Sequence, residues 1–256
     1  MVKGLDRFRE HFANFTDRYV LIGGSACDLA FEEAGVDFRA TKDLDIVLCI
    51  EALDAAFARA FWDFVKLGGY EFQEAATGER KFYRFKKPKN TDFPFMLELF
   101  SRVPDALGEV AGGTLTPIPV DDEVSSLSAI LLDGEYYDWI HSGKRLVGGV
   151  PVVRPEHLIP LKARAWLDLR ERAVLGAHVD THDIKKHRND VFRLLAIVDP
   201  EFRAVMTPRI EADVRRFVED VAGETIDLKA MGVRGTKEAL VSVLASLFIE
   251  EPERPR

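Results

Sequence analysis

The feature that most constrains this chain is a short apolar segment that runs directly into two glycines. Residues 19–22 read Tyr-Val-Leu-Ile, a fully apolar run that is typical of a buried strand. Gly-Gly-Ser follows at 23–25, and a helical pattern of apolar residues then covers 26–34. A buried strand that turns this tightly into a helix favours an α/β fold.

The glycine turn has the chemistry of an anion-binding site. Gly23 and Gly24 carry no side chain, so the backbone can come close to a bulky anion. Amide groups at the start of a helix favour phosphate, and the Ser25 hydroxyl can donate one more hydrogen bond. A structural alternative stays open, because Gly-Gly between a strand and a helix is commonly only a tight turn.

A second motif places two carboxylates on one face of a strand. Asp43 and Asp45 begin a predicted strand over 43–50, and side chains alternate along a strand, so the two aspartates share a face. Their Cα atoms lie about 6.5–7 Å apart. Two carboxylates at this spacing can share a divalent cation or hold two of them. Mg²⁺ is the natural candidate, since it prefers carboxylates together with phosphate oxygens. The alternative is two solvated acids on an exposed strand.

A third acid stands alone in a later apolar run. Glu98 is the only charged residue of the predicted strand over 93–100. A carboxylate among apolar neighbours is costly unless it is paired or bound to a metal. Glu98 is therefore a candidate metal ligand and general base. A salt bridge to a nearby arginine is the alternative.

These motifs together resemble the nucleotidyltransferase superfamily, which has a polymerase-beta-like fold. The branch that is most similar is the AbiEii/AbiGii type of abortive-infection toxin, whose Arg-x-Ser/Thr-x-Asp-hydrophobic-Asp run is matched from Arg39 to Asp45. The resemblance implies that Thr41 also binds the nucleotide. This sequence has glutamate where many relatives have aspartate as the third acid. The residues that match the superfamily in order and type are Gly23, Gly24, Ser25, Asp43, Asp45 and Glu98.

The resemblance extends weakly into the helical part of the chain, as far as residue 195. Lys162 lies in a segment, 155–165, that is similar to a helix of the same branch with an inward lysine. Asp190 lies in a segment, 185–194, that is similar to a later helix. The resemblance implies that Lys162 approaches the nucleotide phosphates and that Asp190 lies near the same cleft. From the sequence alone, both residues are equally compatible with a solvated helix face.

The implied activity is Mg²⁺-dependent transfer of a nucleoside monophosphate from a nucleoside triphosphate to a hydroxyl, with release of pyrophosphate. The implied catalytic residues are Asp43, Asp45, Glu98, Lys162 and Asp190. A tRNA, a protein side chain and a small molecule all remain open as the acceptor. The toxin branch implies an antitoxin partner. The alternatives are a non-catalytic nucleotide-binding or interaction protein on the same fold, and an enzyme of the aminoglycoside-modifying type.

The apolar pattern predicts a helix over 53–67 that is closed by Gly68-Gly69, and a basic and aromatic segment lies further along the chain. Residues 80–89 hold six Lys or Arg, with Phe82, Tyr83 and Phe85 between them. Basic residues interleaved with aromatic ones could contact an RNA acceptor or a triphosphate. A strand hairpin with one solvated face is the alternative.

The hydrophobic pattern changes to a helical period near residue 150. We therefore predict an α/β (α+β) fold, with a mixed-sheet nucleotidyltransferase domain over 1–150 and a helical domain over 151–256. The net charge of −8 belongs to the first of these, which holds 17 Lys or Arg against 25 Asp or Glu. An acidic balance argues against a generally basic nucleic-acid binder.

The same composition indicates a reducing compartment. Cys27 and Cys49 are the only cysteines, which excludes a disulfide scaffold and fits two buried thiols. No apolar run approaches the roughly 20 residues that span a bilayer. Charges run through the first ten residues, where a signal peptide would be apolar. We expect a cytoplasmic protein with no membrane partner.

Overall fold

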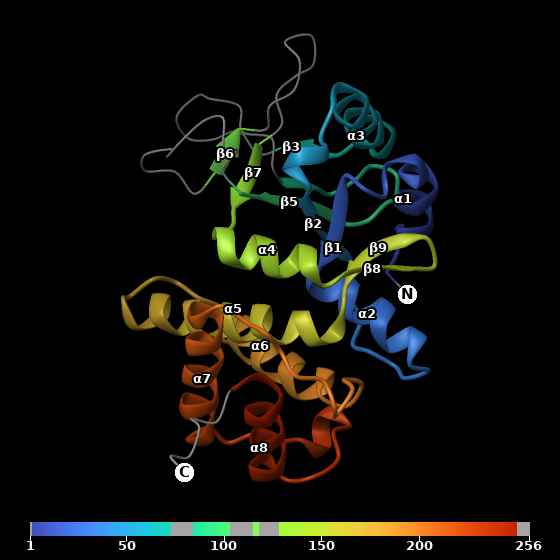
Figure 1. The fold of residues 1–256 in the computed structure, drawn as a ribbon. Helices are drawn as coiled ribbons and strands as arrows, with labels where there is room; N and C mark the ends of the chain where they lie inside the picture. Colours follow the sequence, from blue (N-terminus) through green and yellow to red (C-terminus); the bar gives the residue numbers. More distant parts are fainter. Residues whose placement is uncertain (1, 73–83, 103–114, 118–127, 250–256) are drawn as a thin grey trace. The chain divides into compact units, whose positions relative to one another are not determined.

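The computed structural model describes residues 2–72, 84–102, 115–117 and 128–249. The chain divides into two compact units, Met1–Arg154 and Pro155–Arg256. The first unit carries a mixed β-sheet with helices, and the second consists of helices joined by loops (Figure 1). The predicted α/β class, with a mixed sheet followed by C-terminal helices, is confirmed.

The first unit contains both strands and helices. In chain order they are α1 (Leu5–His11), a 3-10 turn (Ala13–Phe15), β1 (Tyr19–Ile22), α2 (Gly23–Glu33), β2 (Asp43–Leu48), a 3-10 turn (Ile50–Ala52), α3 (Ala55–Gly68), β3 (Glu71–Phe72), β4 (Arg84–Lys86), β5 (Met96–Ser101), β6 (Leu115–Pro117), β7 (Ser128–Leu131), α4 (Gly134–Ser142), β8 (Lys144–Val147) and β9 (Val150–Val153).

The second unit has four helices among its described residues. They are α5 (Pro155–Val174), α6 (Thr181–Leu194), α7 (Pro208–Ala222) and α8 (Lys237–Phe248), with a 3-10 turn at Lys229–Met231. The Asp180 side chain caps α6 by accepting a hydrogen bond from the His182 amide at 2.8 Å. None of the helices in the described part of the chain combines the length and the apolarity needed to cross a bilayer.

The strands of the first unit form one mixed sheet in the order β3-β4-β5-β2-β1-β9-β8, with β7 beside β5 and β6 beside β7. β2 runs parallel to β5 and antiparallel to β1, and β1 runs parallel to β9. β2 therefore lies inside the sheet with a strand on each side, and its apolar residues are buried. This central position fixes where the two aspartates of the motif lie.

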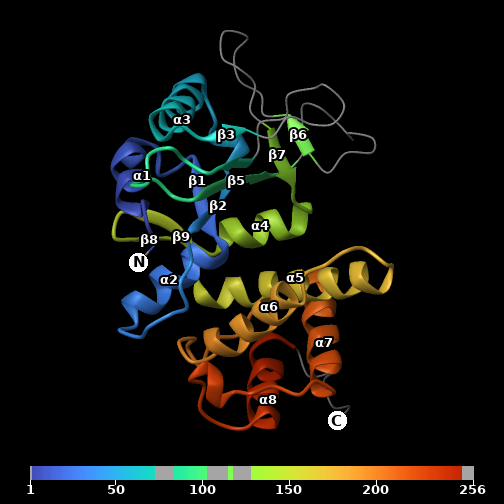
Figure 2. The same cartoon turned by 180° about the vertical axis from the view of Figure 1, so that it is seen from behind.

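Aromatic side chains pack one face of this sheet against α1 and α3. Figures 1 and 2 both show these two helices on one side of the sheet, with α2 and α4 on the other. The Phe8 ring lies 5.3 Å from the Tyr19 ring of β1, and the Phe61 ring lies 5.4 Å from the Phe85 ring of β4. The apolar residues of β2, including Leu44 and Ile46, are fully buried. The alternation of β2 consequently turns Asp43 and Asp45 to the opposite face.

Several element boundaries differ from the sequence predictions. The helical spacing of apolar residues predicts a helix over 5–18, but α1 ends at His11, because Phe12 leaves the helical conformation while its ring stays fully buried. The strand expected over 93–100 begins at Met96, after Pro94, which has no amide for the ladder. The sequence pattern predicts a helix over roughly 200–222, but α7 begins at Pro208, a residue suited to a first helical turn. Both cysteines are free and buried, as predicted.

The sequence predicts short strands at 128–132 and 150–153 with Gly-rich turns between them, and it does not indicate α4. This helix begins after Asp133, whose side chain accepts a hydrogen bond from the Glu135 amide at 3.0 Å. β8, which follows α4, was not predicted either. Both elements are short, and short elements carry too few periodic positions to be recognised.

The N-terminal cap of α3 offers a test of the local structure. Asp54 accepts a hydrogen bond from the Phe57 amide at 2.8 Å and one from Arg18 at 2.9 Å. These contacts, the amide first, lower the pKa of the Asp54 carboxyl. We expect Asp54→Ala to lower the free energy of unfolding by about 1 kcal/mol at pH 7, measured in urea.

The pH dependence of that difference follows from the lowered pKa. A depressed folded-state pKa contributes stability above the unfolded value, which is about 4, and this stability is lost as pH falls through the folded value. The difference between the wild type and Asp54→Ala should therefore shrink below pH 4, whereas Asp63→Ala, at an exposed position of α3, should change little at either pH. A difference that stays constant with pH would show that the carboxylate is not its source.

Candidate active site

The glycine turn packs directly against the second aspartate of the motif. β1 ends at Ile22 and α2 begins at Gly23, three residues before the predicted start. Gly23 has a φ of +67°, and a Cβ built on it would lie 1.8 Å from Oδ2 of Asp45. Only glycine fits there, because the conformation disfavours side chains and the carboxylate occupies the space that one would fill.

The second glycine meets the other half of the same motif. A Cβ on Gly24 would lie 2.6 Å from Oγ1 of Thr41 and 3.7 Å from a terminal nitrogen of Arg39. The structure therefore brings the Gly-Gly turn together with the Arg-x-Thr-x-Asp-x-Asp run, although the two are separated in sequence by the whole of α2. Backbone amides, a hydroxyl, a guanidinium and a carboxylate converge in this place.

Ser25 is placed differently from the sequence expectation. Its side chain has 0% exposure, and its hydroxyl donates a hydrogen bond to the Ile22 carbonyl at 3.1 Å. This bond closes the turn from within. A hydrogen bond from Ser25 to an anion stays a prediction, and it requires the hydroxyl to rotate. The N-cap residue of α2 is Ile22, whose apolar side chain makes no capping hydrogen bond to the first amides of this helix.

The sheet register places the acidic residues in rows across the strands. Asp45 on β2 pairs with Ile22 on β1 and with Glu98 on β5. Glu98 in turn pairs with Arg84 on β4. Register partners in neighbouring strands point to the same face, so Asp45, Glu98 and Arg84 share one face of the sheet. Asp43 lies on that face as well, opposite Met96.

Glu98 forms an ion pair with Arg84. Both Nε and Nη2 of Arg84 contact the same carboxylate oxygen, and Glu98 itself is only 9% exposed. The salt bridge that the sequence left open as an alternative is thus the observed contact. Arg84 is a charged neighbour that the sequence reasoning did not assign, although its alternation with Lys86 around the apolar Phe85 could have indicated it.

The aspartates of β2 have the donor chemistry that suits Mg²⁺. This ion is usually held by one or two carboxylates together with substrate phosphates and water. Asp43 and Asp45 supply two carboxylates on one strand face, and Asp45 lies against the glycine turn. Within the described ranges, no three His, Cys, Asp or Glu side chains converge as a metal group, so Glu98 is not gathered with the aspartates. Its role as a third ligand stays a prediction.

In the second unit, the two residues singled out from the helices pair with each other. Lys162 on α5 is 4% exposed, and its ammonium lies 3.4 Å from Oδ2 of Asp190 on α6. Asp190 has 0% exposure, and its other oxygen lies 3.2 Å from Arg193. Neither Lys162 nor Asp190 belongs to a solvated helix face. Burial of a charged pair is costly, so its presence needs a structural or functional reason.

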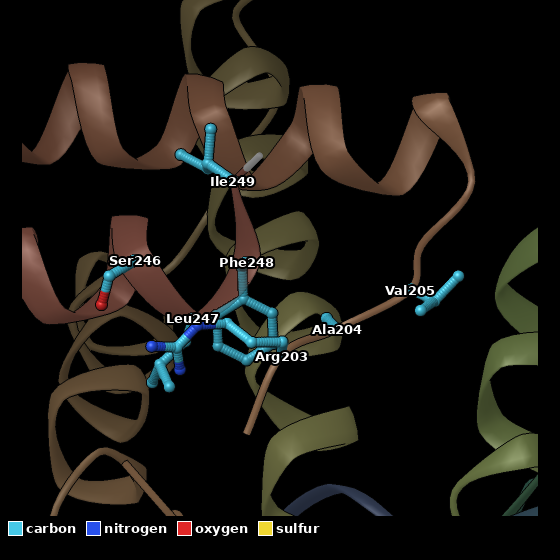
Figure 3. Close-up of a pocket in the computed structure, with 7 residues that line it drawn as sticks. All are labelled: Arg203, Ala204, Val205, Ser246, Leu247, Phe248 and Ile249. Carbon is cyan, nitrogen blue, oxygen red and sulfur yellow. The ribbon is translucent and has the colours of Figure 1, made fainter. Parts of the chain in front are cut away.

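Pockets occur in both units away from these residues. One of about 480 Å³ lies in the second unit, and Figure 3 shows its lining residues: Arg203, Ala204, Val205, Ser246, Leu247, Phe248 and Ile249. Another, of about 390 Å³, is lined in the first unit by Asp28, Glu32, Gly35, Val36, Asp37 and Phe38. Neither lining includes a predicted site residue. Of the basic segment at 80–89, residues 80–83 lie outside the described residues.

No protein-family model matches the chain. No curated protein matches it either. Among solved structures, JHP933 from Helicobacter pylori aligns at 15% identity and a TM-score of 0.40, over 96% of this chain and 86% of that one. The Megavirus polyadenylate synthase aligns at 12% identity and a TM-score of 0.38, over 86% of this chain and 37% of that one. A proposed nucleotidyltransferase from H. pylori aligns at 13% identity and a TM-score of 0.32, over 96% of this chain and 88% of that one. Scores this low carry no conclusion about activity.

Proposed function

We propose that this chain is an Mg²⁺-dependent nucleotidyltransferase that moves a nucleoside monophosphate from a nucleoside triphosphate to a hydroxyl. The observation that carries the proposal is the packing of the Gly23–Gly24 turn against Asp45 and Thr41. A merely structural turn does not need a carboxylate and a hydroxyl against its two glycines. A site for a metal-bound triphosphate needs amides for phosphate beside carboxylates for the cation.

The residues of the first unit divide this work between them. The amides at the start of α2, with Thr41, are suited to hold the outer phosphates of the triphosphate. Asp43 and Asp45 would hold Mg²⁺. Bound there, Mg²⁺ would offset charge on the transferring phosphoryl group and on the pyrophosphate that leaves. Glu98, as a third acid on the same face, is the candidate for accepting the proton of the acceptor hydroxyl, as the resemblance implies.

For the second unit we propose the roles that the resemblance implies. Lys162 would offset phosphate charge, and Asp190 would hold the Lys162 ammonium in position through their 3.4 Å contact. A lysine whose ammonium is held by a buried carboxylate is fixed in orientation, which suits contact with phosphate.

The finer assignment is a toxin of the AbiEii/AbiGii type, acting in the cytoplasm and neutralised by an antitoxin. It rests on the Arg39–Asp45 run and is tested by co-expression with candidate partners. The alternative is a non-catalytic nucleotide-binding protein on the same fold. Three acidic residues on one sheet face favour the enzyme, because a binder has no need of a general base.

The deciding experiment supplies each of the four nucleoside triphosphates, labelled at the α-phosphate, with Mg²⁺. Separate reactions contain total RNA, total protein or a small-molecule fraction as acceptor. We expect label to enter one acceptor class, with an equal amount of pyrophosphate, and EDTA should stop both. Mg²⁺-dependent triphosphate binding without pyrophosphate release would favour the non-catalytic alternative. No triphosphate binding at all would contradict both.

A further inference from the structure

β4 places two positive charges on the same sheet face as the aspartates. Arg84 and Lys86 alternate with Phe85, whose ring is fully buried on the aromatic face. Both charges therefore point to the other face, where Arg84 is in register with Glu98 and Lys86 with Met96. Met96 is in register with Asp43. Two strand spacings, roughly 9.5 Å, separate β4 from β2.

The two cations differ in what holds them. Arg84 is 31% exposed at its side chain and is held by Glu98. Lys86 is partly exposed and makes no ion pair within the part of the chain that the structure describes. Its neighbour Lys87, by contrast, is satisfied by Glu71 at 3.5 Å. The face thus has acids on β2, cations on β4 and the bridging Glu98 between them.

The direction of the reaction indicates what these cations contact. Phosphoryl transfer places the attacking and leaving oxygens in line, on opposite sides of the phosphorus. The amides of the glycine turn lie on the β1 side of the aspartates. Under the proposed function these amides hold the outer phosphates, so the pyrophosphate would leave on that side. The acceptor hydroxyl then approaches from the β5 and β4 side, where Arg84 and Lys86 lie.

We propose that Arg84 and Lys86 bind a phosphate of the acceptor, so that the acceptor class is one that carries a phosphodiester beside its reacting hydroxyl. Besides its proposed role as proton acceptor, Glu98 then orients the Arg84 guanidinium through their ion pair, rather than binding the metal. This inference rests on the proposed function, since it assigns the acceptor side of the same site.

The test separates this phosphate from those of the triphosphate. The probes are a fluorescent single-stranded oligoribonucleotide, followed by anisotropy over a range of salt concentrations, and a nucleoside triphosphate with Mg²⁺, followed by calorimetry. We expect Arg84→Gln and Lys86→Gln each to weaken oligoribonucleotide binding and to reduce its salt slope by about 1. Triphosphate affinity should change less than about 2-fold, because these residues lie on the acceptor side. Lys87→Gln, the matched control, should alter neither.

Two further variants keep the outcome decisive. Arg84→Lys retains the charge and should keep most of the oligoribonucleotide binding, and thermal melting checks that each variant is folded. Glu98→Gln should weaken oligoribonucleotide binding as Arg84→Gln does, yet leave Mg²⁺-dependent triphosphate binding unchanged.

The results that overturn the inference are distinct from those that overturn the proposed function. A wild type that binds the triphosphate but not the oligoribonucleotide removes the acceptor assignment alone. If Arg84→Gln and Lys86→Gln weaken only triphosphate binding, then the phosphate that these residues contact belongs to the nucleotide. If triphosphate binding by Glu98→Gln no longer depends on Mg²⁺, then Glu98 is a ligand of the metal instead. Failure of the wild type to bind any triphosphate overturns the proposed function itself.

Discussion

Asp43→Asn and Asp45→Asn are each expected to lower the rate of pyrophosphate release by about 10³-fold. Each removes one of two carboxylates that would hold the metal, and a metal contributes several kcal/mol of transition-state stabilisation, at about 1.4 kcal/mol for each factor of ten. The fold should persist, because both side chains are only partly buried and asparagine has the same shape. Loss of the repulsion between the two charges should leave the melting temperature equal or higher.

The measurement is pyrophosphate release together with Mg²⁺-dependent triphosphate binding. Asp63→Asn is the control, since Asp63 lies on α3 in an exposed i,i+3 pair with Lys66. Full turnover in either variant, with the control also active, would remove the aspartates from the metal site. A fall in the melting temperature together with the loss of activity would mean that the two aspartates have a structural role instead.

Gly23→Ala is expected to abolish triphosphate binding. The φ of +67° costs an alanine about 1–2 kcal/mol. The new Cβ would also fall 1.8 Å from Oδ2 of Asp45, so the carboxylate must leave its place. The substitution therefore disturbs both the amides of the glycine turn and the Asp45 carboxylate.

A matched variant separates the strain from the displacement. Gly35 has a φ of +69°, and apart from its chain neighbours no atom of the described residues lies within 4 Å of the position that an added Cβ would take. Gly35→Ala therefore bears the same conformational cost without a clash. We expect Gly35→Ala to lose stability but keep triphosphate affinity. Equal affinity in folded Gly23→Ala, measured by calorimetry, would show that the turn serves the fold only.

Several features of the first unit can be predicted from the sequence, for physical reasons. β1 has the predicted bounds, because an uninterrupted apolar run has few alternatives to burial. The alternation of Asp43 and Asp45 with apolar residues set their common face, since the side-chain period of a strand is two. The Gly69 cap, with a φ of +62°, ends α3 where the glycine pair predicted it.

The pairing of charges was not readable in the same way. Glu98 and Arg84 lie on different strands, and their contact depends on a register that the sequence does not state. Lys162 and Asp190 looked compatible with a solvated surface, yet both are buried against each other. The sequence also did not indicate that the Ser25 hydroxyl donates its hydrogen bond to the nearby Ile22 carbonyl.

The sequence by itself determined the class of fold, the glycine turn and the shared face of Asp43 and Asp45, because these depend on local periodicity and on the freedom of glycine. Only the tertiary structure decided that the turn closes on Asp45 and Thr41 and that Glu98 is held by Arg84. Such contacts join residues far apart in the chain. Their formation depends on strand order and register, which packing of the whole sheet selects rather than any one segment.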